Sequence, residues 1–343
     1  MYGTLGLIGF AIFYLTDYTK LEKFSLRIYV ISLIILILSS RSHNTINGLS
    51  TFMIGSFRFA PVSYAIVTFT VSFSGLVIKR GKGDLKGMLK LFGIAVGATI
   101  VCMIQPSFAK AMLLASVFLV VITKAIMSKN FIGSRKVFLS VLYGGGMLST
   151  ILLYLVATDY QLARINFLKY KEYPLGSGYA YYMADKLKAG ARLFGKGDGL
   201  YVNGSGINNV VIGLPEANTD FVLTYIVSAF GWIMGLSVII ILGLIIVRMF
   251  KATKSIHTPY GSYLSVSILT VFTVQSAINI LMNFGLFPYV GLGLPLVSYG
   301  GSNVVTNMVL LGLFLGIYRI KDLVKKDDIS IQKYIEKEEL KNV

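Results

Sequence analysis

The stretch GLGLPLVSYGGSN, residues 291–303, lies between two strongly apolar segments of the chain. Its glycines and its proline predict an irregular backbone beside a membrane-spanning helix. Backbone amides at membrane depth need partners, so such a segment is tolerated only where protein or water surrounds it. We therefore expect residues 291–303, the glycine-rich loop, to line a cavity. A simple glycine-rich turn at the membrane surface is the alternative.

The composition predicts an all-α, polytopic helical membrane protein. Of the 343 residues, 55% are hydrophobic and 14% are charged, and the mean hydropathy is +0.73, which excludes a chain of soluble domains. Cys102 is the single cysteine, so no disulfide can form within the chain. His43 and His257 have no neighbours at metal-ligand spacing, so no protein metal site is predicted.

The apolar stretches predict about nine membrane-spanning helices, each of roughly 20 residues or somewhat fewer. Residues 1–320 would form the membrane domain, and the mixed-charge residues 321–343 would form a cytoplasmic tail. Met1 leads directly into apolar residues, so no cleavable signal peptide is expected. The predicted spans are 2–16, 25–40, 59–78, 88–105, 107–127, 136–157, 220–247, 262–287 and 303–320.

Basic residues predict the orientation of these spans. Most of the 32 Lys and Arg residues fall in alternate short loops and in the tail, which the positive-inside rule places in the cytoplasm. The N-terminus is then extracellular and the C-terminus cytoplasmic. Because the +17 charge is spread over these loops, it does not indicate a nucleic-acid partner.

One long extracellular loop is expected at about 158–219. Within it, residues 178–194 predict a helix with Ala180, Met183, Leu187 and Ala191 on one face. Charged side chains, including that of Lys188, fall on other faces. This pattern suits a helix that lies on the outer membrane surface.

Ionisable groups are absent from the predicted membrane interior. All 15 acidic residues lie outside the hydrocarbon, with Asp220 at the mouth of a span, and Lys110 and Lys124 are close enough to span ends to snorkel. This weighs against a proton-coupled transporter. Gln275, Asn279 and Asn283 recur every four residues and share one face of the eighth span. They either form interhelical hydrogen bonds or build the polar wall of an outward-facing cavity.

The motif LPEANTDF, residues 214–221, places Asp220 at the mouth of the seventh span. Partial desolvation at that depth raises the proton affinity of a carboxylate toward the range of a general base. The alternative is structural, because Asp220, Thr219 or Asn218 could cap the start of the helix.

These motifs resemble the SEDS family (shape, elongation, division and sporulation), typified by RodA, FtsW and SpoVE. The resemblance rests on YQLARINFL, PLGSGY, LFGKG, LPEANTDF, INILMNFGLFP and GLPLVSYGGSN, and it runs from about residue 17 to 318. It implies an enzyme that polymerises lipid II into peptidoglycan glycan strands at the outer face of the bacterial plasma membrane. It also implies a class B penicillin-binding transpeptidase as partner, and it places the family's catalytic aspartate at Asp220.

In this interpretation Asp220 deprotonates the acceptor sugar, and a polyprenyl pyrophosphate leaves. Basic groups of the outer loop would neutralise the pyrophosphate, and assistance by a divalent cation (Mg²⁺ or Mn²⁺) is left open. The polyprenyl chains would lie in grooves between the spans, in contact with membrane lipid. The predicted substrate-binding residues are Arg164, Arg192, Lys196, Glu216, Thr219, Gln275, Asn283, Ser298, Tyr299, Gly300, Gly301 and Ser302.

Several positions depart from the family pattern. Ser63 stands where a glutamate is usual, Ser107 replaces an aspartate, and Asn218 replaces a histidine. Family members usually have ten spans, and this chain matches from the second. A catalytically inactive SEDS paralogue that acts as a membrane scaffold for a transpeptidase is therefore an alternative, and a flippase of lipid-linked precursors is a third.

Overall fold

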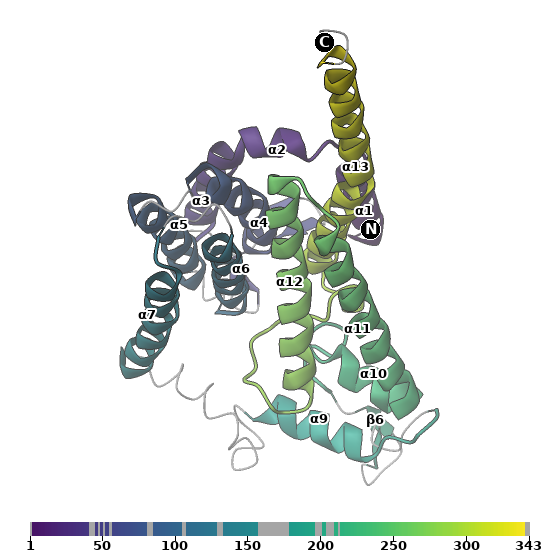
Figure 1. Ribbon diagram of the computed structural model, residues 1–343. Helices are drawn as coiled ribbons and strands as arrows, with labels where there is room; N and C mark the ends of the chain where they lie inside the picture. The colour runs from purple at the N-terminus through teal and green to yellow at the C-terminus, as the bar shows by residue number, and fades with distance from the viewer. Residues whose placement is uncertain are drawn as a thin grey trace.

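The computed structural model describes residues 2–40, 45–46, 49–50, 52–54, 57–80, 85–104, 108–128, 133–156, 178–195, 201–203, 209–211 and 213–339. The described chain is mainly helical, as predicted (Figure 1). The helices are α1 (Tyr2–Leu15), α2 (Thr19–Lys23), α3 (Ser25–Ser40), α4 (Pro61–Arg80), α5 (Leu85–Ile104), α6 (Phe108–Met127), α7 (Arg135–Val156), α9 (Tyr179–Ala189), α10 (Val222–Phe230), α11 (Trp232–Lys254), α12 (Pro259–Asn283) and α13 (Gly301–Glu339).

The described part of the chain also contains three two-stranded antiparallel hairpins, which the sequence did not predict. Two of them precede α4, and the third lies in the predicted outer loop. They pair β1 (Thr45–Ile46) with β2 (Leu49–Ser50), β3 (Phe52–Ile54) with β4 (Phe57–Phe59), and β5 (Tyr201–Asn203) with β6 (Asn209–Val211).

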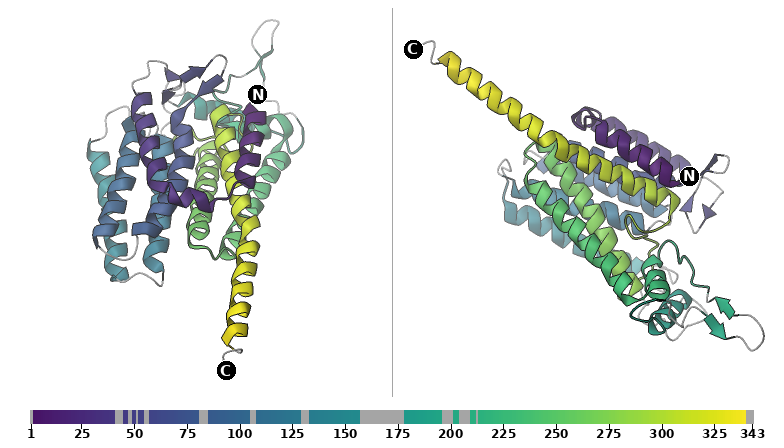
Figure 2. Two further views of the ribbon diagram at one scale, coloured as in Figure 1. Left: turned by 90° about the horizontal axis from the view of Figure 1, so that it is seen from above. Right: turned by 90° about the vertical axis from the view of Figure 1, so that its right-hand side faces the viewer.

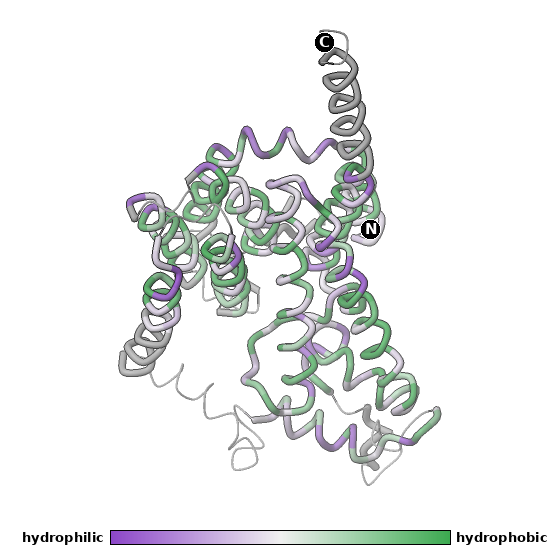
Figure 3. Tube along the Cα trace, viewed as in Figure 1, coloured by the Kyte–Doolittle hydropathy of each residue, from purple (hydrophilic) through white to green (hydrophobic). Residues whose placement is uncertain are grey.

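Among the described residues, five helices are long and apolar enough to cross a membrane, and α1 and α3 are shorter apolar helices. The five segments are Pro61–Lys79, Ala109–Met127, Trp232–Lys254, Pro259–Asn283 and Gly301–Lys321. Apolar residues dominate these helices in Figure 3. The protein is therefore a multi-pass membrane protein, while the total of nine spans and their orientation stay predictions.

The helices pack with α4 at the centre and α11 at the edge. Along its most apolar window α4 is 83% buried, whereas α11 is only 17% buried and presents most of its surface outward. Small and hydroxyl-bearing side chains let helices approach closely in membranes. Ser74 of α4 and Ser267 of α12 meet in this way, with their Oγ atoms 2.9 Å apart. Figure 2 shows α1 beside α13.

The helix predicted at 178–194 is α9, but its buried face differs from the predicted one. Tyr181, Ala184 and Leu187 are buried, and the Tyr181 hydroxyl donates to the Phe287 carbonyl at 2.6 Å. The helix therefore packs against the ends of other elements. Because the buried face is rotated from the predicted one, Lys188 is turned toward the protein.

The span predicted at 220–247 is wrong in its bounds, because the chain breaks within it. α10 ends at Phe230, and α11 begins at Trp232. Gly231 between them has a φ of 97°, which L side chains rarely adopt. The segment after α9 supplies hydrogen-bond partners for the backbone groups at this break. Trp232 N–H donates to the Arg192 carbonyl at 3.0 Å, and Ile233 N–H donates to the Leu193 carbonyl at 3.2 Å. In the other direction, Gly195 N–H donates to the Phe230 carbonyl at 3.1 Å.

The break predicts a strict glycine requirement at position 231. A Cβ atom there would lie 2.5 Å from the Leu193 carbonyl oxygen, in addition to the unfavourable φ. We expect Gly231→Ala to lower the unfolding free energy by roughly 1–3 kcal/mol or more. Thermal unfolding of the detergent-solubilised protein measures this loss. The matched control is Gly243→Ala in α11, where a Cβ meets nothing within 4 Å; equal effects of the two changes would contradict the interpretation.

Candidate functional site

A series of turns before α10 presents Asp220. Glu216 has a φ of 53°, and its backbone carbonyl accepts hydrogen bonds from the N–H groups of Thr219 and Phe221, at 3.1 and 3.0 Å. The Thr219 hydroxyl donates to the Glu216 carboxylate at 2.5 Å. Glu216 and Thr219, both predicted to bind substrate, thus shape the turn that carries Asp220.

Two asparagines of α12 hydrogen-bond the backbone of Asp220. The Asp220 carbonyl accepts hydrogen bonds from Asn279 Nδ2 at 2.8 Å and from Asn283 Nδ2 at 3.0 Å. Both asparagines are buried, at 0% and 1% exposure. The two α12 asparagines therefore hold Asp220 by its main chain and leave its carboxylate unused.

Asn283 also caps α10. Its Oδ1 accepts from the Thr224 N–H at 3.0 Å and from the Thr224 hydroxyl at 2.8 Å. α10 has Phe221 as its N-cap, with no side-chain hydrogen bond from that residue. The alternative in which Asp220, Thr219 or Asn218 caps the helix is therefore wrong, since α12 supplies the acceptor that a cap residue normally provides.

Asp220 is 9% exposed, and its carboxylate Oδ2 accepts a hydrogen bond from the Tyr289 hydroxyl at 2.9 Å. Burial raises its pKa to about 6, while the Tyr289 hydrogen bond and the positive charge of Lys110 act to lower it, and the charge of Glu216 acts to raise it. At neutral pH the group is then mostly ionised and still basic enough to accept a proton.

The glycine-rich loop packs directly against this turn. The Ser298 hydroxyl donates to the Thr219 carbonyl at 2.6 Å, and Tyr299 N–H donates to the Asn218 carbonyl at 2.8 Å. Gly291 has a φ of 62°, and a Cβ atom added there would lie 3.6 Å from Asp220 Oδ2. The two motifs at 214–221 and 291–303 therefore lie against each other.

Several residues predicted to bind substrate are buried and form hydrogen bonds within the protein. Gln275 donates to the Gly293 carbonyl at 2.8 Å and to Asn303 Oδ1 at 3.0 Å. Gln275 and Asn283 are each 1% exposed, and Ser298 is 3% exposed. Their substrate-binding roles are corrected: the amides of the α12 stripe donate to carbonyls of the two neighbouring irregular segments, and Gln275 also bonds Asn303 of α13.

The remaining predicted residues are spread around this core. Tyr299 is 71% exposed, and its neighbour Gly300 is partly exposed. Gly301 packs against the ring of Tyr2. Ser302 faces the start of α4, where its hydroxyl accepts from the Ala60 N–H at 3.4 Å. Arg192 is exposed beside the α10–α11 break, whereas Arg164 and Lys196 lie outside the described residues.

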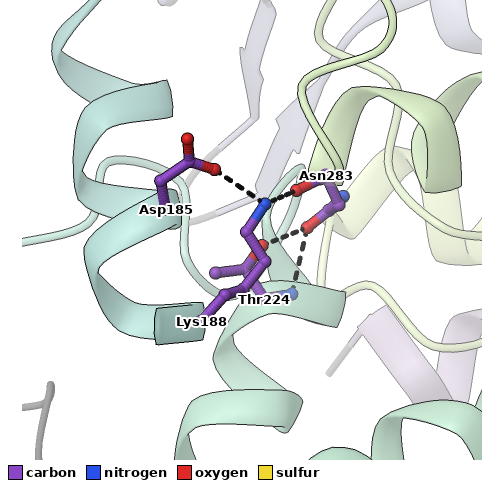
Figure 4. Close-up of polar contacts among 4 residues, drawn as sticks. All are labelled: Asp185, Lys188, Thr224 and Asn283. Carbon is purple, nitrogen blue, oxygen red and sulfur yellow. Dashed lines mark hydrogen bonds and ion pairs between the residues drawn. The ribbon is translucent and has the colours of Figure 1, made fainter. Parts of the chain in front are cut away.

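Lys188 is a site residue that sequence reasoning missed. Its Nζ donates to the Asn283 carbonyl at 2.6 Å and pairs with Asp185 at 3.1 Å (Figure 4). It also lies over the Phe284 ring, 5.5 Å from the centroid. Lys188 thus joins α9 to the C-terminal end of α12, where a cation is favourable. The helical spacing in 178–194 pointed to the wrong face.

Lys110 is a second residue whose role was missed. It was expected to snorkel, but it is 5% exposed near the start of α6, so that expectation is wrong. Its charge interacts favourably with that of Asp220. A lysine within the motif QPSFAKA was the available signal.

The described residues contain no group of three or more His, Cys, Asp or Glu side chains that could hold a metal ion.

The chain matches the sequence model of the FtsW, RodA and SpoVE family, described as "Cell cycle protein", over residues 1–322. It is 27% identical to a probable peptidoglycan glycosyltransferase FtsW of Thioalkalivibrio sulfidiphilus, over 84% of this chain and 70% of that protein. It is 26% identical to the stage V sporulation protein E of Bacillus subtilis, over 93% of this chain and 85% of that protein.

Solved structures share the fold. One belongs to a peptidoglycan synthase complex described as coordinating polymerization and crosslinking; its TM-score is 0.74 at 19% identity, over 93% of this chain and 87% of that chain. The rod shape determining protein RodA of Thermus thermophilus gives a TM-score of 0.64 at 18% identity, over 93% of this chain and 86% of that chain.

The double role of Asn283 predicts a large effect of its truncation. Asn283→Ala removes the acceptor of Thr224 N–H and one donor to the Asp220 carbonyl, and it leaves buried groups unpaired. We expect a loss of about 2–4 kcal/mol of unfolding free energy, measured by thermal unfolding in detergent. Thr273→Ala is the matched control on α12, since that exposed hydroxyl bonds the carbonyl of Leu269 within its own helix. A similar loss in both variants would refute the role.

Proposed function

The chain belongs to the FtsW, RodA and SpoVE family of cell cycle proteins, and on this premise we propose that it is a peptidoglycan glycosyltransferase that polymerises lipid II. The site at Asp220 would lie at the outer face of the bacterial plasma membrane, where the growing glycan strand is extended. A buried carboxylate that is free of any capping duty is the single observation that carries the proposal.

In the proposed reaction the 4-hydroxyl of the acceptor N-acetylglucosamine attacks the anomeric carbon of the donor. A glycosidic C–O bond forms, and the bond from the anomeric carbon to the pyrophosphate oxygen breaks. Asp220 accepts the proton of the attacking hydroxyl. A sugar alkoxide leaving group needs protonation, which is why glycoside hydrolysis generally uses two carboxylates. A lipid pyrophosphate leaves as a stable anion, so one base is sufficient.

The geometry around Asp220 supports the role of a base. Its main chain is anchored by Asn279 and Asn283, so the carboxylate is presented in a fixed orientation, and positioning of this kind lowers the barrier of a bimolecular step. Its raised pKa, about 6, lies near the operating pH, where general base catalysis is most effective.

Positive charge is needed to stabilise the departing pyrophosphate. Lys110, a buried lysine whose ammonium form would be favoured by an ionised Asp220, is one proposed contributor, and Arg192, exposed next to the α10–α11 break, is another. Arg164 and Lys196 remain proposed contributors on sequence grounds. A divalent cation at the pyrophosphate is left open, and no step above requires one.

The proposed partners follow from this reaction. Lipid II and the glycan strand are the substrates, and the polyprenyl chains would lie between the membrane helices in contact with lipid. A class B penicillin-binding transpeptidase would crosslink the product. The structural likeness to a chain of a peptidoglycan synthase complex supports such an assembly.

The assignment is tested by removing the base. We expect Asp220→Ala to reduce polymerisation of labelled lipid II by the purified protein to background, because it removes the proposed base. Gel analysis of glycan strands measures the product. The control is Asp17→Asn, a partly exposed residue on the loop before α2 where asparagine can replace the hydrogen bond to Thr19 N–H. An Asp220→Ala protein of undiminished activity would sink the proposal.

Complementation separates catalysis from a scaffold role. Wild type should rescue a strain deleted for the gene, and Asp220→Ala should not. If both rescue equally, the protein works through binding a transpeptidase and not through chemistry.

The pH dependence of the reaction provides a further prediction. Activity should rise with pH through an apparent pKa of about 6, because the deprotonated carboxylate is the base. The Tyr289 hydrogen bond lowers the pKa of Asp220, so Tyr289→Phe should move the acidic limb of the profile to higher pH by about 0.5–1 unit. Tyr225→Phe, a partly exposed tyrosine of α10, is the control. A shift to lower pH, or an equal shift in both variants, would contradict the role of Tyr289.

A further inference from the structure

A cavity of about 610 Å³ lies between α6 and α12, far from Asp220. Its walls include the C-terminal part of α6 and the first residues of α12. Asn283, which holds Asp220, is the last residue of α12, and a helix of 25 residues is about 37 Å long. The cavity therefore lies at the opposite end of the bundle from the candidate catalytic site, and its volume is in the range of small-molecule sites, about 300–1,000 Å³.

Lys124 is the central polar group of this cavity. Its Nζ donates to both the carbonyl and the hydroxyl of Ser262, each at 2.6 Å, and lies 5.1 Å from the centroid of the Tyr263 ring. An ammonium group has three N–H donors, so one remains for a ligand. The side chain is half-buried, and its orientation is fixed by α12.

The charge of Lys124 lacks a counter-ion in the described chain. Its ammonium forms no ion pair with a described carboxylate, and no described wall residue of the cavity is acidic. His257 contributes an imidazole to the wall, and the guanidinium of Arg135 donates to the carbonyl of Ser128, another wall residue, at 3.3 Å. A partly desolvated charge is costly unless an opposite charge accompanies it. The cavity is thus suited to an anion.

Two apolar residues of the wall are exposed on the outer surface of α6. Val120 is 40% exposed and Met127 is 64% exposed, both on α6. They lie within the membrane-spanning segment Ala109–Met127. Val120 lies one helical turn deeper in the membrane than Lys124, and Met127 lies at the end of the helix. A ligand here meets a cation and hydroxyl groups with an apolar side chain on the deeper side, which suits a phospholipid.

Basic residues also gather at this end of the bundle. Lys251 and Lys254 close α11, and Lys321 of α13 donates to the Ser255 hydroxyl at 3.1 Å. The positive-inside rule places such an end at the cytoplasmic leaflet, where anionic lipids collect and where basic pockets between helices bind their headgroups.

We propose that the cavity between α6 and α12 is a binding site for an anionic phospholipid of the cytoplasmic leaflet. Lys124 contacts the phosphate through its remaining N–H, His257 and Met127 lie beside the headgroup, and an acyl chain follows Val120 toward the membrane interior. The site is separate from the catalytic site, and it does not depend on the proposed glycosyltransferase activity.

Native mass spectrometry of the detergent-solubilised protein tests this site with dioleoyl phosphatidylglycerol and dioleoyl phosphatidylcholine as probes. We expect one phosphatidylglycerol molecule to bind more tightly than phosphatidylcholine. Lys124→Gln should weaken phosphatidylglycerol binding about fivefold, the factor expected for one lysine near anionic lipid, and should leave phosphatidylcholine unchanged. The matched control is Lys251→Gln, which changes an exposed lysine of α11 at the same end of the bundle. It should have little effect on phosphatidylglycerol binding.

A second pair of variants separates lipid binding from helix packing, because Lys124 also joins α6 to α12. Lys124→Arg keeps the charge and should retain phosphatidylglycerol. Met127→Glu leaves the Lys124 hydrogen bonds in place and adds a repelling carboxylate at the wall, so it should weaken binding, whereas Met127→Gln should not.

Three results would overturn the proposal. Equal binding of the two lipids by the wild type would remove the anion preference. Equal effects of Lys124→Gln and Lys251→Gln would place the lipid elsewhere. Displacement of bound phosphatidylglycerol by millimolar inorganic phosphate would show a site for a free anion and not for a lipid.

Discussion

Asn279 and Asn283 provide hydrogen bonds to the buried carbonyl of Asp220, which lies at the end of an irregular segment. Residues 214–221 form no regular element that could pair the carbonyl of Asp220, and a buried unpaired carbonyl costs about 1–3 kcal/mol. The two amides provide that pairing from α12, and Asn283 at the same time accepts the open N–H of Thr224. The glycine-rich loop rests on the same helix through Gln275 and Asn279. The turn that carries Asp220 and the glycine-rich loop are thus both held by one face of α12.

Much of this arrangement follows from the sequence. The spacing of four in Gln275, Asn279 and Asn283 requires one helix face, and the composition of residues 291–303 requires partners for an irregular backbone. The spacing does not predict which backbone groups these side chains bond. These backbone groups lie on segments far along the chain, such as the carbonyls of Asp220 and Leu292. The choice between a substrate-lined wall and interhelical bonding therefore needed the packing.

Hydropathy also has limits that particular residues make clear. Hydropathy does not reveal the break at Gly231, because Phe230, Gly231 and Trp232 continue an apolar run. The break depends on the positive φ of Gly231. In α9 the tyrosines count as neither clearly apolar nor polar, so Ala180 and Tyr181 compete for the buried face, and the helix turned Lys188 inward. Lys110 was assigned to a span end by position alone, whereas its burial depends on the helices around it.

The cap that Asn283 places on α10 has a consequence for the order of assembly. The residue that caps the helix lies 59 positions after Thr224 in the chain, and α10 has only nine residues, too few for a stable isolated helix. During synthesis α10 leaves the ribosome well before its cap exists. The turn that carries Asp220 can reach its final form only after α12 has entered the membrane and docked. Biogenesis therefore keeps the site incomplete until nearly the whole membrane domain is in place.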